Sequence, residues 1–227
     1  MLHSGEALAR DVRAYRAASR MTGEVYSTLI NLSGRRRFTS QRLVLYAVLA
    51  AQGRDGALQV SKDALATFRD AHKALVEGNA ELPGVFCDEL HEAYFGTEGS
   101  DETIRAFIVL AERTHEAIAS GARAAQALLD QLVDSGTPLL AALNSLTQLY
   151  ETLARRHSAQ ARKQLVGVMS DIESIAKQAR IVSFNAQIVA SRAGAPGREF
   201  SVVAAELSRI TSHIDELVRE ALRNSGG

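Results

Sequence analysis

The chain has 227 residues, of which 46% are apolar and 23% are charged. This is the composition of a globular protein with a substantial core, and it excludes a disulfide scaffold, collagen and low-complexity disorder. The 26 basic residues balance the 26 acidic ones, so no overall charge attracts the protein to nucleic acid or to a membrane surface. Three prolines, no tryptophan and few aromatic residues beside many Ala, Leu, Arg, Glu and Gln predict an all-α fold.

Cysteine content and apolar segments indicate the compartment. The single cysteine, Cys87, allows neither an intramolecular disulfide nor a cysteine-based zinc cluster, which is typical of a reducing environment. Residues 1–20 carry several charges and no apolar stretch of signal-peptide length. The longest nearly unbroken apolar run, residues 43–51, is far shorter than the roughly 20 residues of a membrane-spanning helix. The sequence therefore predicts a cytoplasmic protein without a membrane span.

Helical periodicity dominates the first part of the chain. Apolar residues three and four positions apart predict one long helix over residues 8–50, which ends before Gly53. A second helix is expected over residues 61–76, closed by Gly78. A short helical segment is expected at residues 85–95.

A third and a fourth helix are expected to complete a bundle. Ser100 precedes two acidic residues that suit the positive end of a helix dipole, which predicts it as the N-cap of a helix that runs to Leu132. In Gly136-Thr137-Pro138, glycine is expected to end that helix, threonine to cap the next one and proline to take its first position. The fourth helix then meets no breaker before Gly194. An antiparallel four-helix bundle over residues 1–155 is therefore predicted.

Residues 156–227 follow a stricter period. Residues 155–164 are polar and basic but contain neither Gly nor Pro, so the fourth helix is expected to continue through them. Beyond them, apolar residues alternate three and four positions apart, which is the heptad repeat of a coiled coil. They are Leu165, Val168, Ile172, Ile175, Ala179, Val182, Ala186, Val189 and Ala193, then Phe200, Val203, Leu207, Ile210, Ile214, Leu217 and Ala221. Two such arms predict a helical hairpin with its tip at residues 194–197, in which Phe200 packs beside Val189.

The turn and its flanks carry the most specific pattern in the chain. Residues 175–207, IAKQARIVSFNAQIVASRAGAPGREFSVVAAEL, resemble the signalling tip of bacterial methyl-accepting chemotaxis receptors. The resemblance implies a set of tip residues, which are Asn185, Arg192, Gly194, Gly197, Arg198 and Phe200. It also implies a chemotaxis histidine kinase and its coupling protein as partners.

Three departures from this family pattern lie at the tip. Val189 and Ala195 stand where the family has glutamates, and Glu199 stands where it has a glycine. Family members contact trimer neighbours, the kinase or the coupling protein at these positions, so weak or absent kinase activation is expected. The returning arm ends near Gly227, before the second methylation helix of the family, which indicates a truncated signalling arm.

A second resemblance lies near the other end. Residues 29–50, LINLSGRRRFTSQRLVLYAVLA, resemble the INxAGxQRMLSQR motif of the sensor domain of type IV pilus chemotaxis transducers and of related nitrate and nitrite sensor kinases. The resemblance implies a sensor bundle that binds a small anion, of the nitrate or nitrite type, at the interface of a homodimer. It places Gly34, Arg37 and Arg42 at the glycine and the two arginines of the family motif.

The chemistry of the motif residues agrees with an anion site. A guanidinium group is planar and permanently charged, and its parallel donors match a planar oxyanion. Two copies of Arg37 that face each other across a dimer axis would need an anion between them. Asn31 and Gln41 are our candidates for orienting the arginines. The alternative is a solvated basic surface that binds no ligand.

Other kinds of chemistry find no pattern in the sequence. The six histidines show neither HExxH spacing nor an i,i+4 pair, so no metal site is predicted. Residues 194–197 lack the Gly-Lys-Ser/Thr ending of a phosphate loop, so no cofactor is expected. No nucleophile is accompanied by a base, which argues against an enzyme. Two functions stay open: a chemoreceptor-like protein that relays anion binding through its coiled coil, and a helical dimerisation or interaction module that has lost ligand binding and kinase control.

Overall fold

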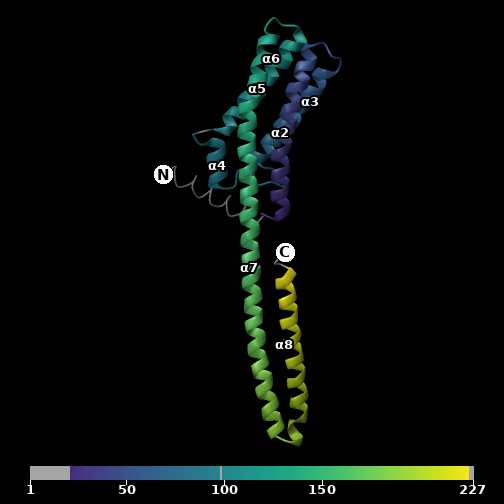
Figure 1. Ribbon diagram of the computed structural model, residues 1–227, viewed down its shortest axis with the longest axis vertical. Coiled ribbons are helices and arrows are strands. Elements are labelled where there is room, and N and C mark those ends of the chain that lie inside the picture. The colour runs from purple at the N-terminus through teal and green to yellow at the C-terminus, as the bar shows by residue number, and fades with distance from the viewer. Residues whose placement is uncertain (1–20, 98, 225–227) are drawn as a thin grey trace. The chain divides into compact units, whose positions relative to one another are not determined.

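The computed structural model describes residues 21–97 and 99–224, and all regular secondary structure in these ranges is helical (Figure 1). The helices are α2 (Gly23–Ala51), α3 (Ala57–Glu77), α4 (Asp88–Phe95), α5 (Ser100–Ser120), α6 (Ala125–Asp134), α7 (Gly136–Arg192) and α8 (Arg198–Asn224), with the short 3-10 helix η1 (Ala195–Gly197) before α8. The predicted all-α fold is confirmed.

The first helix begins later than its periodicity predicts. Thr22 has an extended backbone, and its side-chain oxygen accepts a hydrogen bond from the Val25 amide, which makes Thr22 the N-cap of α2. One unbroken helix over residues 8–50 is therefore wrong, and residues 8–20 of that prediction lie outside the described residues. The short segment predicted at residues 85–95 is helical as α4, from Asp88 onward.

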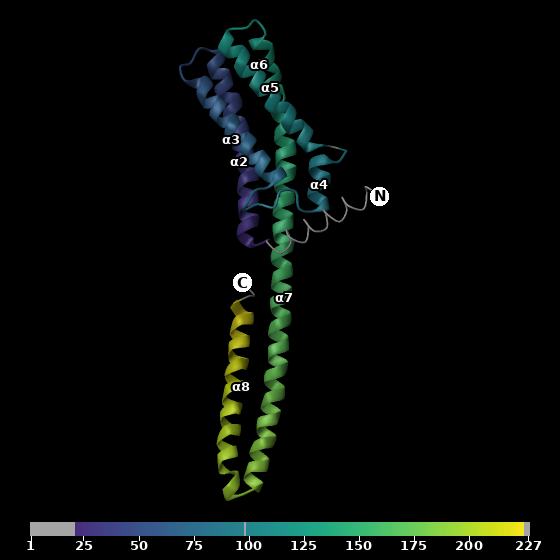
Figure 2. The same cartoon turned by 180° about the vertical axis from the view of Figure 1, so that it is seen from behind.

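The predicted third helix is in fact two helices. Gly99, not Ser100, is the N-cap of α5, and Ser100 is its first helical residue. The helix stops at Gly121, which adopts φ 64°, and the Ala122 amide donates back to the Ala117 carbonyl. This is the Schellman arrangement that ends a helix at a left-handed glycine. The chain reverses there, so α6 forms a hairpin with α5 (Figures 1 and 2).

The junction between α6 and α7 also differs from the prediction. Gly136 is the first residue of α7, so it does not end the preceding helix and Thr137 does not cap the next one. The Ser135 amide bonds to the Gln131 carbonyl, and the Leu139 amide bonds to the Ser135 carbonyl. These i to i−4 bonds carry helical pairing across the junction. Pro138 is tolerated because the first amides of a helix need no helical partner.

The chain divides into two compact units between Arg155 and Arg156. We call the first unit the bundle; it contains α2 to α6 and the start of α7. We call the second unit the hairpin; it contains the rest of α7, η1 and α8. The expectation that α7 stays helical through residues 155–164 is confirmed.

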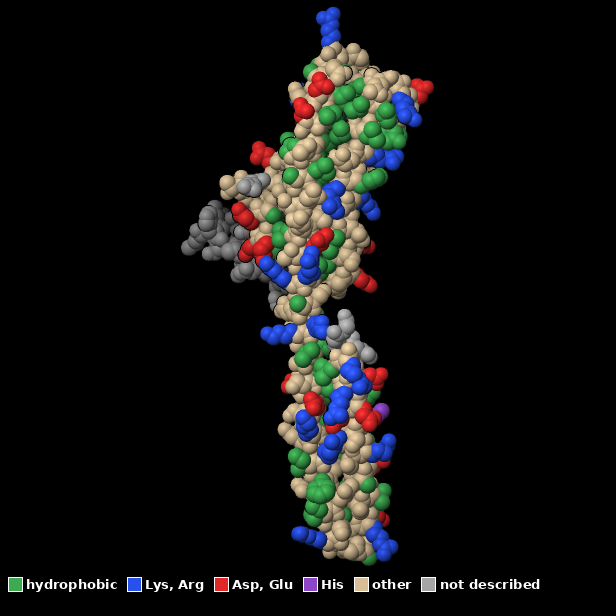
Figure 3. Space-filling view, viewed as in Figure 1, with side chains coloured by type: hydrophobic (Ala, Val, Ile, Leu, Met, Phe, Trp, Pro, Cys, Tyr) green, Lys and Arg blue, Asp and Glu red, His purple; other side chains and the backbone are tan. Residues whose placement is uncertain are grey.

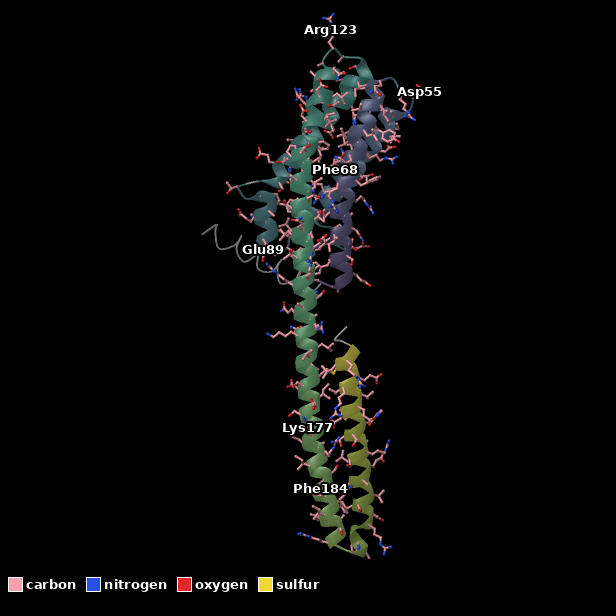
Figure 4. All side chains as sticks on the ribbon, viewed as in Figure 1. Asp55, Phe68, Glu89, Arg123, Lys177 and Phe184 are labelled. Carbon is pink, nitrogen blue, oxygen red and sulfur yellow. The ribbon has the colours of Figure 1, made fainter. Side chains whose placement is uncertain are left out.

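The bundle has one apolar core, to which α2, α3, α5, α6 and α7 contribute. Its fully buried members include Leu29, Leu43, Phe68, Leu75, Ile104, Leu132, Leu139 and Leu143. Phe68 of α3, labelled in Figure 4, packs edge to face on Phe107 of α5 with ring centroids 5.6 Å apart. Burial of one such side chain stabilises the fold by roughly 1.5–3 kcal/mol.

The two arms of the hairpin pair through a face that the heptad pattern did not predict. Apart from Asp215, their buried residues recur every seven positions, and all but the last are small: Ala176, Ser183, Ala190, Gly197, Ala204, Thr211 and Val218. We call this set the small-residue seam, and none of its members belongs to the predicted stripe. Phe200 is 74% exposed and Val189 is 66% exposed, so the predicted packing of Phe200 inside the hairpin is wrong. Small side chains let the two helices pack closely, and the larger apolar residues stay outside.

Candidate functional sites

The polar segment of α2 turns one arginine into the bundle core. Ser33, Arg36, Thr39 and Ser40 are buried, and Arg36 is the largest fully buried side chain of the described residues. Successive helix residues are rotated by about 100°, so burial of Arg36 leaves Arg37 near the surface. The sequence singled out Arg37 and missed Arg36, although its interrupted apolar stripe allowed either residue to point inward.

Arg36 is held by side chains from several helices. Its Nη1 donates to His72 Nδ1 at 3.1 Å and its Nη2 to Ser33 Oγ at 3.3 Å. Its guanidinium carbon lies 5.8 Å from the centre of the Tyr94 ring, within the range of a cation–π contact. Its Nε has no hydrogen-bond partner among the described residues. Burial of such a cation is costly, so its few acceptors matter for stability.

His72 links Arg36 to a carboxylate. Arginine can only donate, so His72 Nδ1 accepts, and the ring proton lies on Nε2, which donates to Asp101 Oδ1 at 2.9 Å. The second Asp101 oxygen is 2.6 Å from Arg105 Nε. Burial and the neighbouring Arg36 charge lower the pKa of His72 to about 4. His72 is therefore neutral near pH 7, between one cation and one anion.

The network reaches two further helices through hydroxyl groups. Ser33 and Thr147 of α7 are joined by a 2.8 Å hydrogen bond, and the hydroxyls of Tyr94 and Tyr150 lie 3.3 Å apart. Burial, followed by the neighbouring Tyr94, raises the pKa of Tyr150 well above its ordinary value. We call Arg36, His72 and Asp101 the buried relay, which connects α2, α3 and α5.

The residues predicted to bind an anion lie on the opposite, outer side of α2. Asn31, Arg37, Gln41 and Arg42 are exposed, and Gly34 is half-buried. Arg37 Nη1 donates to Asn144 Oδ1 of α7 at 3.0 Å, whereas the Arg42 guanidinium lies 5.2 Å from the centre of the Tyr46 ring. The arginines are thus held by different partners, and within one chain they do not enclose a pocket.

Two exposed apolar residues share that outer side. Phe38 is 64% exposed and Leu45 is 55% exposed. Together with Gly34 and Gln41 they follow a spacing of four, three and four, which aligns them in one stripe along the helix. We call Gly34, Phe38, Gln41 and Leu45 the outer stripe of α2. Among the described residues, a Cβ atom on Gly34 would meet only Arg37 Nη2, at 3.6 Å, so none of the described helices approaches this glycine closely.

A surface groove of about 520 Å³ lies elsewhere in the bundle. Its lining includes Thr97, Glu102 and Phe107, along α5, and Pro138 at the start of α7. None of the residues predicted from the sequence lines this groove.

The tip of the hairpin consists of two structural glycines and exposed polar groups. Gly194 adopts φ 66°, a conformation that favours glycine, and Gly197 lies so close to the Ala190 backbone that any side chain would clash there. Asn185, Arg192 and Arg198 are exposed. The structure thus places the predicted tip residues around one turn, and Phe200 is exposed beside them.

Most of the predicted heptad stripe faces outward on both arms of the hairpin. Its large exposed members are Leu165, Val168, Ile175, Val182 and Val189 on α7, and Phe200, Val203, Leu207, Ile210 and Leu217 on α8. We call these residues the open face, and Figure 3 shows hydrophobic side chains at the surface of the hairpin among Lys and Arg. On each arm the open face is displaced in the same rotational sense from the small-residue seam. Because the arms are antiparallel, both stripes fall on the same side of the hairpin.

The opposite edge of the seam is polar. Arg180 Nη2 donates to Asp215 Oδ2 at 2.5 Å and lies 3.4 Å from Ser212 Oγ. A separate apolar patch of Ile181, Phe184 and Ile188 lies on α7 near the tip, where Figure 4 labels Phe184.

The described residues contain no group of three or more His, Cys, Asp or Glu side chains placed to hold a metal ion. Among them, no helix is both long and apolar enough to cross a bilayer.

Comparison with known proteins identifies relatives of the C-terminal part. Residues 133–221 match the family model of the methyl-accepting chemotaxis protein (MCP) signalling domain. The chain is 36% identical over 94 residues to the methyl-accepting chemotaxis protein CtpM of Pseudomonas aeruginosa, a match that covers 41% of this chain and 14% of CtpM. No solved structure matches the chain.

These matches support the first of the two resemblances. The matched range runs from the end of α6 to Ala221 of α8, so it includes the hairpin except for the last residues of α8. This part of the chain is similar to a signal-transducing domain, as its tip motif predicted. The family model does not extend to residues 29–50, and the sensor resemblance there stays a prediction.

Proposed function

We propose that this protein is a cytoplasmic, chemoreceptor-like signalling protein that works as a homodimer, with residues 1–155 as its sensor and residues 156–227 as its signalling hairpin. The observation that carries the proposal is the open face, which lies on one side of the hairpin across both arms. Water-exposed apolar side chains in a continuous heptad stripe are typical of an unfilled helix interface.

A second copy of this chain is the occupant that best fits the open face. The residues between the seam and the open face, such as Ile172 and Ile214, are only half-buried. Contacts within one hairpin therefore bury only part of the apolar heptad stripe. A second hairpin related by a two-fold axis would present the same stripe in return, which satisfies the repeat on both sides. The other edge carries the Arg180–Asp215 pair, and its exposed apolar residues Ile181, Phe184 and Ile188 lie on α7 near the tip and do not continue as a heptad stripe along both arms.

The outer stripe of α2 supports a two-fold contact in the bundle as well. Phe38 and Leu45 would pack against their copies, and Gly34 would permit close approach of the two helices. Arg37 flanks this stripe. We propose that two Arg37 side chains meet a small planar oxyanion such as nitrate or nitrite there, with Gly34, Arg42, Asn31 and Gln41 around it.

The residues at the tip of the hairpin determine which partner proteins it can bind. The MCP signalling match supports a chemotaxis histidine kinase and its coupling protein as partners. Val189 places an exposed valine where the family has a glutamate, and Ala195 removes a second carboxylate. We therefore expect weak or absent kinase activation.

A matched pair of neighbouring residues tests the homodimer. Val182 on the open face is 61% exposed and Ile181 on the other side of α7 is 62% exposed. In analytical ultracentrifugation the wild type should dimerise, Val182→Lys should shift it to monomer, and Ile181→Lys should leave it dimeric. A wild type that is monomeric at every concentration, or two variants that behave alike, would contradict the proposal.

Calorimetry tests the anion site. Nitrate and nitrite should bind the wild-type dimer, Arg37→Ala should abolish the heat of binding, and Arg35→Ala, at an exposed neighbouring arginine, should retain it. Absence of binding to the wild type would favour the second function, a dimerisation module without ligand. The Arg37–Asn144 hydrogen bond supports that second function, because it gives Arg37 a partner without any anion.

A further inference from the structure

The bundle contains a buried polar chain that neither the dimer nor the anion site uses. We propose that Arg36, His72 and Asp101, the buried relay, act as a proton sensor in which protonation of His72 separates α2 from α3. The inference is independent of the anion site, since all three side chains lie inside a single chain.

The geometry makes the relay depend on one protonation state. His72 Nδ1 accepts from Arg36, and Nε2 donates to Asp101. A second proton on the ring would lie on Nδ1 and point at an arginine donor 3.1 Å away. Two donors cannot share that contact, and Arg36 stays protonated at any physiological pH. Only movement of one side chain relieves the conflict.

Among the described residues, Asp101 is the one carboxylate that contacts His72 and could accept the new charge. The buried cation Arg36 faces it from α2, and Asp101 with Arg105 faces it from α5. From α4 the Tyr94 ring lies 6.2 Å away, and the Tyr94 hydroxyl is in turn bonded to Tyr150 of α7. The Asp101 carboxylate thus already pairs directly with Arg105 and is linked to Arg36 only through His72. The pKa of His72, lowered to about 4 by burial and then by Arg36, agrees with this imbalance.

The contact that breaks is the one between α2 and α3. Protonation turns the hydrogen bond from His72 to the Asp101 carboxylate into an ion pair and strengthens it, so His72 stays with α5. Arg36 loses its acceptor on α3 and keeps Ser33 Oγ and the Tyr94 ring, while its Nε already lacks a partner. A buried guanidinium with so few contacts must move toward water. Because Arg36 belongs to α2, acid would shift the helix that also carries Gly34 and Arg37.

Imidazole NMR on the full chain, in buffer without added nitrate or nitrite, tests the electrostatic step. His72 of the wild type should stay neutral well below its ordinary pKa. In Arg36→Met the competing cation is gone and Asp101 remains, so the pKa of His72 should rise by about one unit or more. An unchanged pKa in this variant would overturn the proposal. If Arg36→Met does not fold, Arg36→Gln, whose neutral amide can still donate to His72, makes the same test.

Hydrogen exchange tests the structural step. Between about pH 7 and about pH 5, and after correction for intrinsic rates, amides of residues 33–40 and 68–75 should lose protection by roughly tenfold or more. His72→Gln should lose this pH dependence, and Arg36→Met should weaken it, because the pKa of His72 then lies closer to its ordinary value. His115→Gln, which removes the other acid-sensitive buried histidine and leaves the relay intact, should keep it. Protection that is constant with pH in the wild type, or a loss that follows His115 rather than His72, would overturn the proposal.

Discussion

The bundle buries charged side chains in its core, whereas the hairpin leaves large apolar side chains exposed. The bundle buries an arginine, a histidine and an aspartate within its core and connects them by hydrogen bonds. The hairpin pairs its arms through small residues and leaves valines, isoleucines, leucines and two phenylalanines exposed. The bundle thus satisfies its helices within one chain, whereas the hairpin satisfies only one face of each arm.

The difference follows from the number of helices available. In the bundle, several helices surround each apolar face, so large side chains find partners and even a cation finds acceptors. In the hairpin, two antiparallel helices bury one stripe each, and a heptad repeat with a second stripe needs further helices. The pattern of buried and exposed apolar stripes on the hairpin is therefore that of one half of a four-helix assembly.

The sharpest test of this comparison is a matched pair of phenylalanines. Phe68 in the bundle is fully buried and Phe200 in the hairpin is 74% exposed. Phe68→Ala should lower the free energy of unfolding by roughly 3–5 kcal/mol, whereas Phe200→Ala should cost less than about 0.5 kcal/mol in the monomer. Urea denaturation at low protein concentration measures both. A large loss for Phe200→Ala under these conditions would show that the hairpin closes by itself.

Acid should destabilise the bundle selectively. Burial lowers the pKa of His72 and of His115 to about 4 from an ordinary value of 6.5; the second cause is Arg36 for His72 and Lys62 for His115. Between these values the unfolded chain binds more protons than the folded one, so stability is complete above pH 6.5 and falls as the pH approaches 4. Each histidine should account for about 3 kcal/mol. Urea titrations from neutral to acid pH measure the loss, and a flat profile would contradict it.

Two glycines distinguish the observed helix ends from the predicted ones. Gly121 has φ 64°, and Gly136 is a helical residue at which a Cβ would meet no atom within 4 Å. Gly121→Ala should destabilise the chain by about 1 kcal/mol, and Gly136→Ala should stabilise it by up to about 1 kcal/mol. Thermal unfolding decides the signs. Destabilisation by Gly136→Ala would support the sequence prediction that Gly136 ends a helix.

The smallest expected effect is that of Gly34→Ala in α2, which should change monomer stability and dimer formation in opposite directions. Gly34→Ala should add helix stability of at most about 1 kcal/mol in the monomer, because the only neighbour of the new Cβ is the end of the Arg37 side chain. It should lower the dimer fraction, since it fills the outer stripe. Gly167→Ala in α7 meets open space and serves as the control. Equal dimer fractions in the two variants would show that α2 is not part of the dimer interface.

Local signals predicted most elements because they act through neighbouring residues. The all-α fold, the closure of α3 at Gly78 and the helical passage through residues 155–164 all follow from propensity, capping and the lack of breakers. The break at Gly121 is a local signal of the same kind, but the apolar periodicity continues across it and favours one helix. The tip glycines, Gly194 and Gly197, were found by motif, and the structure gives each a steric reason.

What the sequence by itself determined is the set of faces that each helix can present: the heptad stripes of the two arms, the polar interruption of α2 and the turn at residues 194–197. Only the tertiary structure decided which face meets which. Arg36 rather than Arg37 enters the core, because His72 of α3 accepts its hydrogen bond there and is itself bonded to Asp101 of α5. The small-residue seam rather than the heptad stripe joins the arms, because two helices alone pack most closely where side chains are smallest. Periodicity reports that a face is apolar, and the partner of that face depends on helices distant in sequence.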